Sequence, residues 1–205
     1  MRYLYLLLVL SALSACGSLK PEEEALPQLP FYVHDGPPTL TLFTMINNET
    51  DFGAHSGLMV SASQRVIFDP AGTLKHEVLN EHADVLYGVT PSVLDFYTRA
   101  HARKTYHVAI QTIEVSPEVA EHALRLVQNN GEVWSVHCAH GISQILRQLS
   151  GFEGMNITYR PQKLRQAFSQ YAGVSERVLY EYDDDDKSKA LREYVAELAL
   201  AQATE

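Results

Sequence analysis

The stretch that decides the fold runs from residue 39 to residue 69 and reads TLTLFTMINNETDFGAHSGLMVSASQRVIFD. Residues 39–46 alternate threonine with apolar residues, which is typical of a β-strand. A polar connection separates them from two further apolar segments, 55–60 and 65–69, and we expect these segments to pair as a hairpin around 61–64. The stretch therefore predicts a small antiparallel sheet at the start of the folded domain.

Beyond this hairpin, the apolar spacing predicts helices and strands in turn. Thr90 and Ser116 are typical helix N-caps, because a proline follows each of them at the first helical position. We expect helices over 91–103, 117–130, 136–149, 161–171 and 188–203, and strands over 105–115, 156–160 and 177–182. Strands in small groups with helices between them indicate an α+β domain rather than a doubly wound sheet.

Length and composition favour one folded domain, which we assign to residues 39–205. The chain has 205 residues, with 46% apolar and 20% charged residues, which fits a protein with a real core. Asp and Glu total 25 against 16 Lys and Arg. This acidic balance argues against a nucleic-acid partner held by phosphate contacts. We expect a monomer.

Residues 1–15, MRYLYLLLVLSALSA, have the arrangement of a signal peptide: Arg2, a short apolar run, and small residues before Cys16. The apolar run is shorter than the roughly 20 residues that span a bilayer. The end of the segment, Leu13-Ser14-Ala15-Cys16, resembles the lipobox of bacterial lipoproteins. The resemblance implies lipidation of Cys16 and a periplasm-facing protein anchored to the outer membrane. The alternative is an ordinary secretory signal in which Cys16 is incidental.

Residues 16–38 are rich in glutamate and proline, which is typical of a tether between a lipid anchor and a domain. The alternative is an ordered but irregular arm. With Cys16 lipidated, Cys138 has no partner for an internal disulfide, since the chain contains two cysteines. A single thiol in an oxidising compartment is either buried or kept for its reactivity.

Cys138 lies near the start of the helix expected over 136–149, with Ser135 as its N-cap. The apolar residues that recur with Cys138 at helical spacing are Ile142, Ile145, Leu146 and Leu149. A thiol at a helix N-terminus is favoured as thiolate, which makes Cys138 a candidate nucleophile. The alternative is a small core residue, because free cysteine is among the most buried residue types.

His55 and Asp69 are candidates for the base and the group that orients it. If the hairpin loop is 61–63, Val60 faces Gln64 and His55 faces Asp69, so the imidazole and carboxylate share one face of the sheet. A two-residue loop would put Asp69 on the other face. The alternative role for Asp69 is to open the turn that continues with Pro70.

Two short motifs carry a family resemblance: His-Ser-Gly-Leu-Met-Val at 55–60 and His-Cys-Ala-His-Gly-Ile at 137–142. Their order resembles the circularly permuted branch of the NlpC-type papain-like proteins, which includes bacterial lipoproteins and the lecithin retinol acyltransferase group. The resemblance covers roughly residues 39–150. It implies a papain-like α+β core, with Cys138 as nucleophile, His55 as base and Asp69 as the third polar residue. It implies neither a metal nor an organic cofactor.

The sequence departs from this family at His137, where an asparagine is expected, and at Asp69, where the acyltransferase group has a second histidine. His137, Cys138 and His140 also have the residue types of a zinc site. However, residues one and two positions apart diverge on a helix, so we expect no metal there. The remaining histidines, His101 among them, are interpreted as structural.

Two further groups of residues have both a functional and a structural interpretation. Tyr87 and Tyr106 are candidates for lining a pocket, although aromatic residues are more often core. Arg99, Arg103 and Lys104 form a basic group that could meet an anionic substrate or a lipid headgroup, whereas the simpler interpretation is a solvated helix end.

The sequence therefore predicts a cell-envelope cysteine hydrolase or acyltransferase that acts on an amide or ester bond. Its candidate substrates are peptidoglycan peptides, small peptides and lipid acyl groups. The alternative is a catalytically inactive lipoprotein that serves as a binding or assembly module, with Cys138 as a buried core residue.

Overall fold

The computed structural model of the protein describes residues 29–72, 74, 76, 78–181 and 184–203. The signal peptide predicted at 1–15, the lipidation predicted at Cys16 and the first part of the predicted tether lie outside the described residues. Within the described residues, every helix is too short or too polar to cross a membrane.

The domain is built on one seven-stranded sheet in the order β4-β5-β3-β2-β1-β6-β7, and every neighbouring pair of strands is antiparallel. The strands are β1 (Thr39–Asn47), β2 (Gly53–Ser61), β3 (Arg65–Phe68), β4 (Glu81–His82), β5 (Val85–Leu86), β6 (Tyr106–Glu114) and β7 (Ser175–Leu179). The helices are α2 (Pro91–His101), α3 (Pro117–Gln128), α4 (Cys138–Leu146), α5 (Pro161–Phe168) and α6 (Ser188–Ala203). This arrangement confirms the predicted α+β class.

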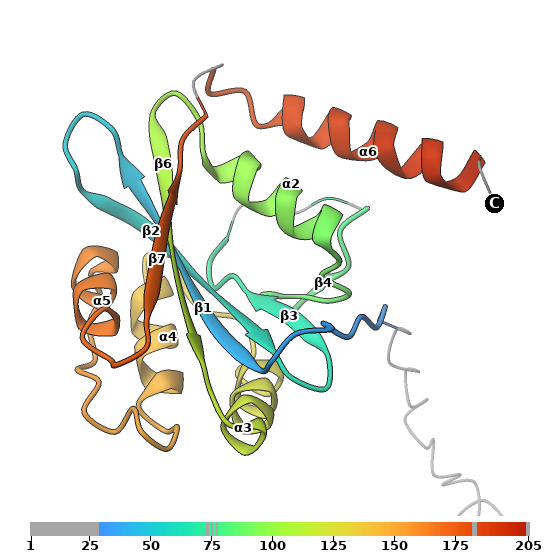
Figure 1. Ribbon diagram of the computed structural model, residues 1–205. Helices are drawn as coiled ribbons and strands as arrows, with labels where there is room; N and C mark the ends of the chain where they lie inside the picture. The colour runs from blue at the N-terminus through green and yellow to red at the C-terminus, as the bar shows by residue number, and fades with distance from the viewer. Residues whose placement is uncertain (1–28, 73, 75, 77, 182–183, 204–205) are drawn as a thin grey trace, which may run out of the picture.

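Helices cover both faces of the sheet: α3, α4 and α5 lie on one side, and α2 and α6 lie on the other (Figure 1). Alternate residues of β1 enter the two cores, with Leu40 and Leu42 in the core shared with α3, α4 and α5, and Phe43 and Met45 in the core shared with α2 and α6. Because side chains on both faces of a strand are then removed from water, even Thr44 of β1 is fully buried. The site described below lies where these two helical layers approach the same strand, β2.

The predicted starts of α2 and α3 are confirmed. Thr90 accepts a hydrogen bond from the Val93 amide at 3.2 Å, and Ser116 accepts one from the Val119 amide at 3.4 Å. The predicted start of α4 is wrong, because this helix begins at Cys138 and the side chain of its cap residue, His137, makes no hydrogen bond to the first turn. Val136 has a φ of 64°, a left-handed conformation that interrupts the helix predicted to begin there.

Three smaller expectations differ from the structure. The strand predicted over 156–160 is absent, because side chains take its backbone donors: Thr158 donates to Ser143 Oγ, and Arg160 donates to Thr158 Oγ1. The last strand, β7, begins two residues before the range predicted for it. Strands β4 and β5 were not predicted, since each has only two residues and is too short to show a pattern.

Residues 29–38 of the predicted tether contain no regular helix or strand before β1 begins. This segment lies against β3, because the Arg65 amide donates to the Tyr32 carbonyl at 2.8 Å and the Arg65 guanidinium lies 4.7 Å from the centre of the Tyr32 ring. The described end of the tether is therefore an irregular arm along the domain.

Candidate active site

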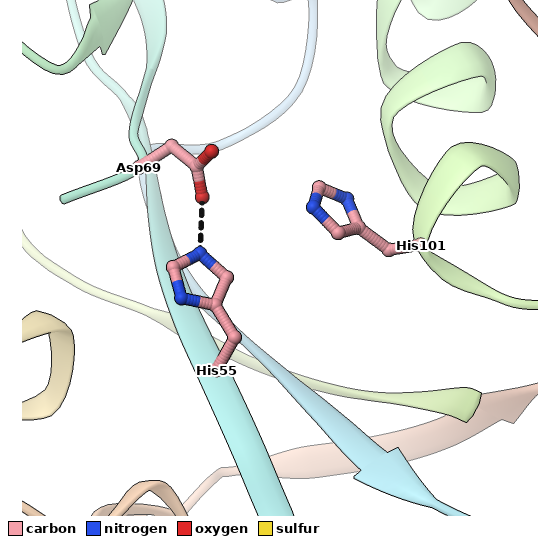
Figure 2. Close-up of side chains that lie close together, drawn as sticks. All are labelled: His55, Asp69 and His101. Atoms are coloured by element: carbon pink, nitrogen blue, oxygen red, sulfur yellow. Dashed lines mark hydrogen bonds and ion pairs between the residues drawn. The ribbon is translucent and has the colours of Figure 1, made fainter. Parts of the chain in front are cut away.

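The side chains of His55 and Asp69 form a direct hydrogen-bonded pair. His55 lies near the start of β2, and Asp69 is the first residue after β3. The distance between His55 Nε2 and Asp69 Oδ1 is 2.7 Å, and both side chains are largely buried (Figure 2). The structure thus brings together two of the three residues predicted to form the site, in the relation expected of a base and its orienting carboxylate.

The strand register that produces this pair differs from the predicted one. Val60 pairs with Val66 rather than with Gln64, and the loop comprises residues 62–64 instead of 61–63. Moving the loop by one residue shifts each partner by two, and a shift of two keeps side chains on the same face. Continued beyond β3, the register sets Asp69 opposite Gly57, so His55 reaches the carboxylate diagonally.

Tyr97 of α2 holds the Asp69 carboxylate from the helical layer that His55 and Asp69 face. The Tyr97 hydroxyl donates to Asp69 Oδ1 at 2.8 Å, and both groups are buried. Gly57 makes this contact possible, since a Cβ atom at that position would collide with Tyr97 Oη. His55 and Tyr97 therefore both donate hydrogen bonds to the Asp69 carboxylate. The glycine of the His-x-Gly motif, Gly57, is required because a larger residue would displace Tyr97.

Cys138 is the first residue of α4, and its side chain is 5% exposed. The His55 side chain and the backbone N–H groups of Ser56 and Ala139 lie close enough to its sulfur to favour the thiolate. Because Nε2 of His55 is bonded to Asp69, Nδ1 is the ring nitrogen left for the thiol. The helix N-terminus adds a partial positive charge at the sulfur. All three predicted residues therefore form one chain of contacts.

The pKa values of His55 and Cys138 are shifted in opposite directions. Burial alone would lower the pKa of His55, but the hydrogen bond to Asp69, the interaction with Cys138 and the charges of both raise it to about 10. Burial alone would raise the pKa of Cys138, but His55 and the two backbone donors lower it. Both shifts favour the thiolate–imidazolium form of the pair over the neutral form.

The groups around Asp69 keep it ionised. Burial would raise the pKa of this carboxyl, yet the hydrogen bond and charge of His55, the neighbouring His101 and the Tyr97 hydroxyl together lower it. Burial and the carboxylate raise the pKa of Tyr97 well above its ordinary value, so its hydroxyl remains a donor. Asp69 is consequently an acceptor for both residues throughout the neutral pH range.

The thiol and the imidazole line a cleft of about 540 Å³, a volume typical of small-molecule and peptide sites. Side chains from separate segments form its walls: Tyr106 of β6, Val136 before α4 and Lys187 before α6. The cleft gives a substrate access to Cys138, whose own exposure is small.

Some of the aromatic and basic residues predicted near the site line the cleft, and others lie in the core or form ion pairs outside it. Tyr106 and Arg103 line the cleft, whereas Tyr87 belongs to the core beneath α3 and α4. Arg99 forms ion pairs with Glu181 at 3.2 Å and with Glu193, so it lies outside the cleft. The predicted basic group therefore contributes Arg103, and not Arg99, to the site.

His101, interpreted from the sequence as structural, lies beside the pair and also lines the cleft (Figure 2). It is the last residue of α2, and the centres of its ring and the His55 ring are 6.0 Å apart. Burial lowers the pKa of His101 to about 4, and the nearby charges do not reverse this. The sequence spacing does indicate that Tyr97 and His101 lie together, because they are four residues apart and therefore share one face of α2.

The histidines next to Cys138 lie elsewhere. The ring of His140 stacks on Tyr159 at 4.4 Å, and the His137 ring contacts both of these rings. In the part of the chain that the structure describes, the residues close enough to share a metal ion are His55, Asp69 and His101. His137 and His140 are not among them.

Comparison of the chain with protein-family models, with curated proteins and with solved structures found no match.

Proposed function

We propose that the protein is a papain-like cysteine hydrolase or acyltransferase that acts on an amide or ester bond. The observation that carries this proposal is the position of His55, bonded through Nε2 to Asp69 and interacting with Cys138, at an open cleft. A nucleophile, a base and a group that orients the base are the parts required for covalent acyl transfer.

In the first half of the reaction, the Cys138 thiolate attacks the carbonyl carbon of the substrate. A bond forms between Sγ and this carbon while the carbonyl π electrons move to its oxygen. The tetrahedral intermediate then collapses, and His55 gives its Nδ1 proton to the departing amine or alcohol. The products of this half are the free leaving group and a thioester on Cys138.

In the second half, neutral His55 accepts a proton from the incoming nucleophile, which attacks the thioester carbonyl. Collapse of this second intermediate releases the acyl product and restores the thiolate beside the imidazolium. Water as the nucleophile makes the reaction a hydrolysis, whereas an amine or alcohol makes it an acyl transfer. Asp69 keeps the ring in one orientation through both halves, because its carboxylate stays ionised.

The backbone N–H of Cys138 is our candidate donor to the negatively charged oxygen of each intermediate. The first N–H groups of a helix have no acceptor within that helix, and Cys138 begins α4. A donor beside the nucleophile stabilises the charge that develops in the transition state. The same helix terminus would thus assist both the thiolate and the oxyanion.

The proposed family, location and substrate rest on the sequence. The antiparallel sheet that carries His55 and the helix that carries Cys138 support the permuted papain-like class. The signal peptide at 1–15 and the lipobox ending at Cys16 support a lipoprotein on the periplasmic side of the outer membrane. A peptidoglycan peptide or a lipid acyl group is the proposed substrate, and the proposed state is a monomer.

The proposal is tested by acetylating the full chain, in a Cys16→Ala background, with p-nitrophenyl acetate as an unspecific ester. We expect an early burst of p-nitrophenol and an acetyl group that mass spectrometry maps to Cys138. Both should be lost in Cys138→Ser and slowed by about 100-fold or more in His55→Ala, within the range of general base catalysis. His122→Gln, on helix α3 and outside the set of residues that line the cleft, should match the parent protein.

Acetylation that is equal in the parent, His55→Ala and His122→Gln proteins would contradict the proposal. So would a Cys138 that remains unmodified in the native protein and reacts only after denaturation. Either result would favour the alternative, a binding or assembly module with a structural cysteine.

A further inference from the structure

His101 has a position that the proposed reaction does not use. Its ring lines the cleft beside His55, and the ligand atoms of His55, Asp69 and His101 all lie within 4.8 Å of one another (Figure 2). Burying a second imidazole next to an existing imidazole–carboxylate pair is costly unless its polar atoms are satisfied. The cluster of His55, Asp69 and His101 is therefore a candidate for a second role, separate from acyl transfer.

The orientation of the His101 ring is fixed by a backbone contact. Its Nδ1 is 2.8 Å from the Tyr97 carbonyl oxygen, and because a carbonyl only accepts, Nδ1 carries the proton. In the neutral ring, Nε2 then presents its lone pair. Histidine ligands of metal ions characteristically donate their other N–H to a backbone carbonyl or carboxylate in this way.

The carboxylate has a comparable outer contact. Tyr97 donates its hydroxyl to Asp69 Oδ1, so one residue of α2 orients both His101, through its carbonyl, and Asp69, through its side chain. Such outer hydrogen bonds hold metal ligands in place and tune their basicity. The cluster is thus ordered by partners that would remain after an ion entered.

We propose that His55, Asp69 and His101 bind a divalent transition-metal ion of the zinc type, and that the bound ion switches the active site off. Two imidazole nitrogens and one carboxylate oxygen are ordinary zinc ligands, with a water from the cleft as the fourth. Tetrahedral ligands at about 2.1 Å from an ion lie about 3.4 Å apart, so closing the site requires these groups to move by about an ångström.

The inhibition, unlike the binding, rests on the proposed function. The ion replaces the proton at His55 Nε2 and breaks the hydrogen bond to Asp69, and this proton passes to solvent. The His55 ring then keeps its other proton on Nδ1 and has no lone pair for a proton from the incoming water or other nucleophile. The ring therefore cannot act as the base in thioester breakdown.

Zinc binding to the full chain, in the Cys16→Ala background and freed of metal with EDTA, tests the site by isothermal titration. We expect one ion per chain in the parent and in Cys138→Ser. His101→Gln should weaken binding by more than the roughly 10–100-fold that loss of an outer-shell partner costs. His140→Gln should bind like the parent, because its ring stacks on Tyr159 outside the cluster. Circular dichroism checks that each variant is folded.

Three results would overturn the site: no zinc binding by the parent, unchanged binding in folded His101→Gln, or binding lost in Cys138→Ser and retained in His101→Gln. The last would show an ion held by the thiolate. Zinc should also stop p-nitrophenol turnover after the initial burst, and turnover that continues at saturating zinc would overturn the inhibition. A parent protein that binds zinc but is never acetylated would contradict only the proposed function.

Discussion

At the scale of the residue, the decisive feature is a buried carboxylate with two donors on the same oxygen. Asp69 Oδ1 accepts from His55 at 2.7 Å and from Tyr97 at 2.8 Å. A buried carboxylate without such donors would take up a proton and lose its hold on the imidazole. Tyr97 therefore acts as a positioning residue, through Asp69, for the proposed base.

Tyr97→Phe tests whether Tyr97 positions His55 through Asp69. Removing a hydrogen bond to a charged buried group should lower the free energy of unfolding by roughly 1.5–3 kcal/mol. It should also slow Cys138 acetylation, because Asp69 orients His55 less firmly. Urea unfolding and the p-nitrophenol burst measure the two effects.

Tyr171→Phe is the matched control, since its hydroxyl donates to the neutral Phe152 carbonyl at 3.4 Å, far from the cleft. We expect a smaller loss of stability, within about 0.5–1.5 kcal/mol, and an unchanged burst. If Tyr97→Phe also left the burst unchanged, Tyr97 would have a structural role alone.

The sequence predicted Cys138, His55 and Asp69 as the site, because they have the residue types of a nucleophile, a base and a carboxylate that orients the base. Tyr97 and His101 were not identified as part of the site. Both lie on a helix whose apolar face predicts only burial, and nothing in sequence spacing tells which strand that face covers. Their contacts with Asp69 and His55 cross from one layer of the fold to another.

At the scale of the element, strand β2 serves both sides of the sheet at once. His55 faces the α2 layer, and the backbone N–H of the next residue, Ser56, reaches the sulfur of Cys138 on α4. Between strand and helix, Gly57 leaves the space that the Tyr97 hydroxyl occupies. The close approach of β2 and α2 is therefore a requirement of the site.

Gly57→Ala tests this requirement. The added Cβ would overlap Tyr97 Oη, which belongs to a rigid and fully buried ring, so the helix or the ring must move. Overpacking of this kind costs about 1–3 kcal/mol, and the Tyr97–Asp69 bond should be lost with it. We expect a lower melting temperature and a slower acetylation burst.

Gly154→Ala provides the comparison, because a Cβ at that glycine would meet no atom within 4 Å. This variant should keep the stability and the burst of the parent to within about 0.5 kcal/mol. Equal behaviour of the two alanine variants would mean that the β2–α2 approach does not depend on Gly57.

The hairpin illustrates how far element-level prediction could go. The apolar segments 55–60 and 65–69 predicted the two strands and the face shared by His55 and Asp69. It did not give the register, since a loop at 61–63 and a loop at 62–64 bury the same residues. The register depends on which loop residues turn the chain, and the apolar pattern carries no information about that.

At the scale of the whole molecule, the fold brings residues far apart in sequence to one cleft. The sheet holds β2 between two helical layers (Figure 1). Cys138 from one layer and His101 from the other line the same cleft as His55. The α+β class followed from the order of apolar segments. The approach of the two helical layers to β2 could not be predicted from these segments, because it depends on the strand order β3-β2-β1-β6.

The central claim is that His55 and Cys138 form a thiolate–imidazolium pair. Its most direct test is the rate of Cys138 alkylation by iodoacetamide against pH, in EDTA, for the parent, His55→Ala and His122→Gln proteins in the Cys16→Ala background. The lowered pKa of Cys138 means that the reactive thiolate persists as the pH falls below the usual titration range of a thiol.

We therefore predict that alkylation of the parent and of His122→Gln is already fast at neutral pH, with a midpoint well below the roughly 8.5 of free cysteine. In His55→Ala the midpoint should move to that value or above, because burial still disfavours the thiolate while its partner is gone. Slow alkylation with the same midpoint in all three proteins would contradict the thiolate–imidazolium pair.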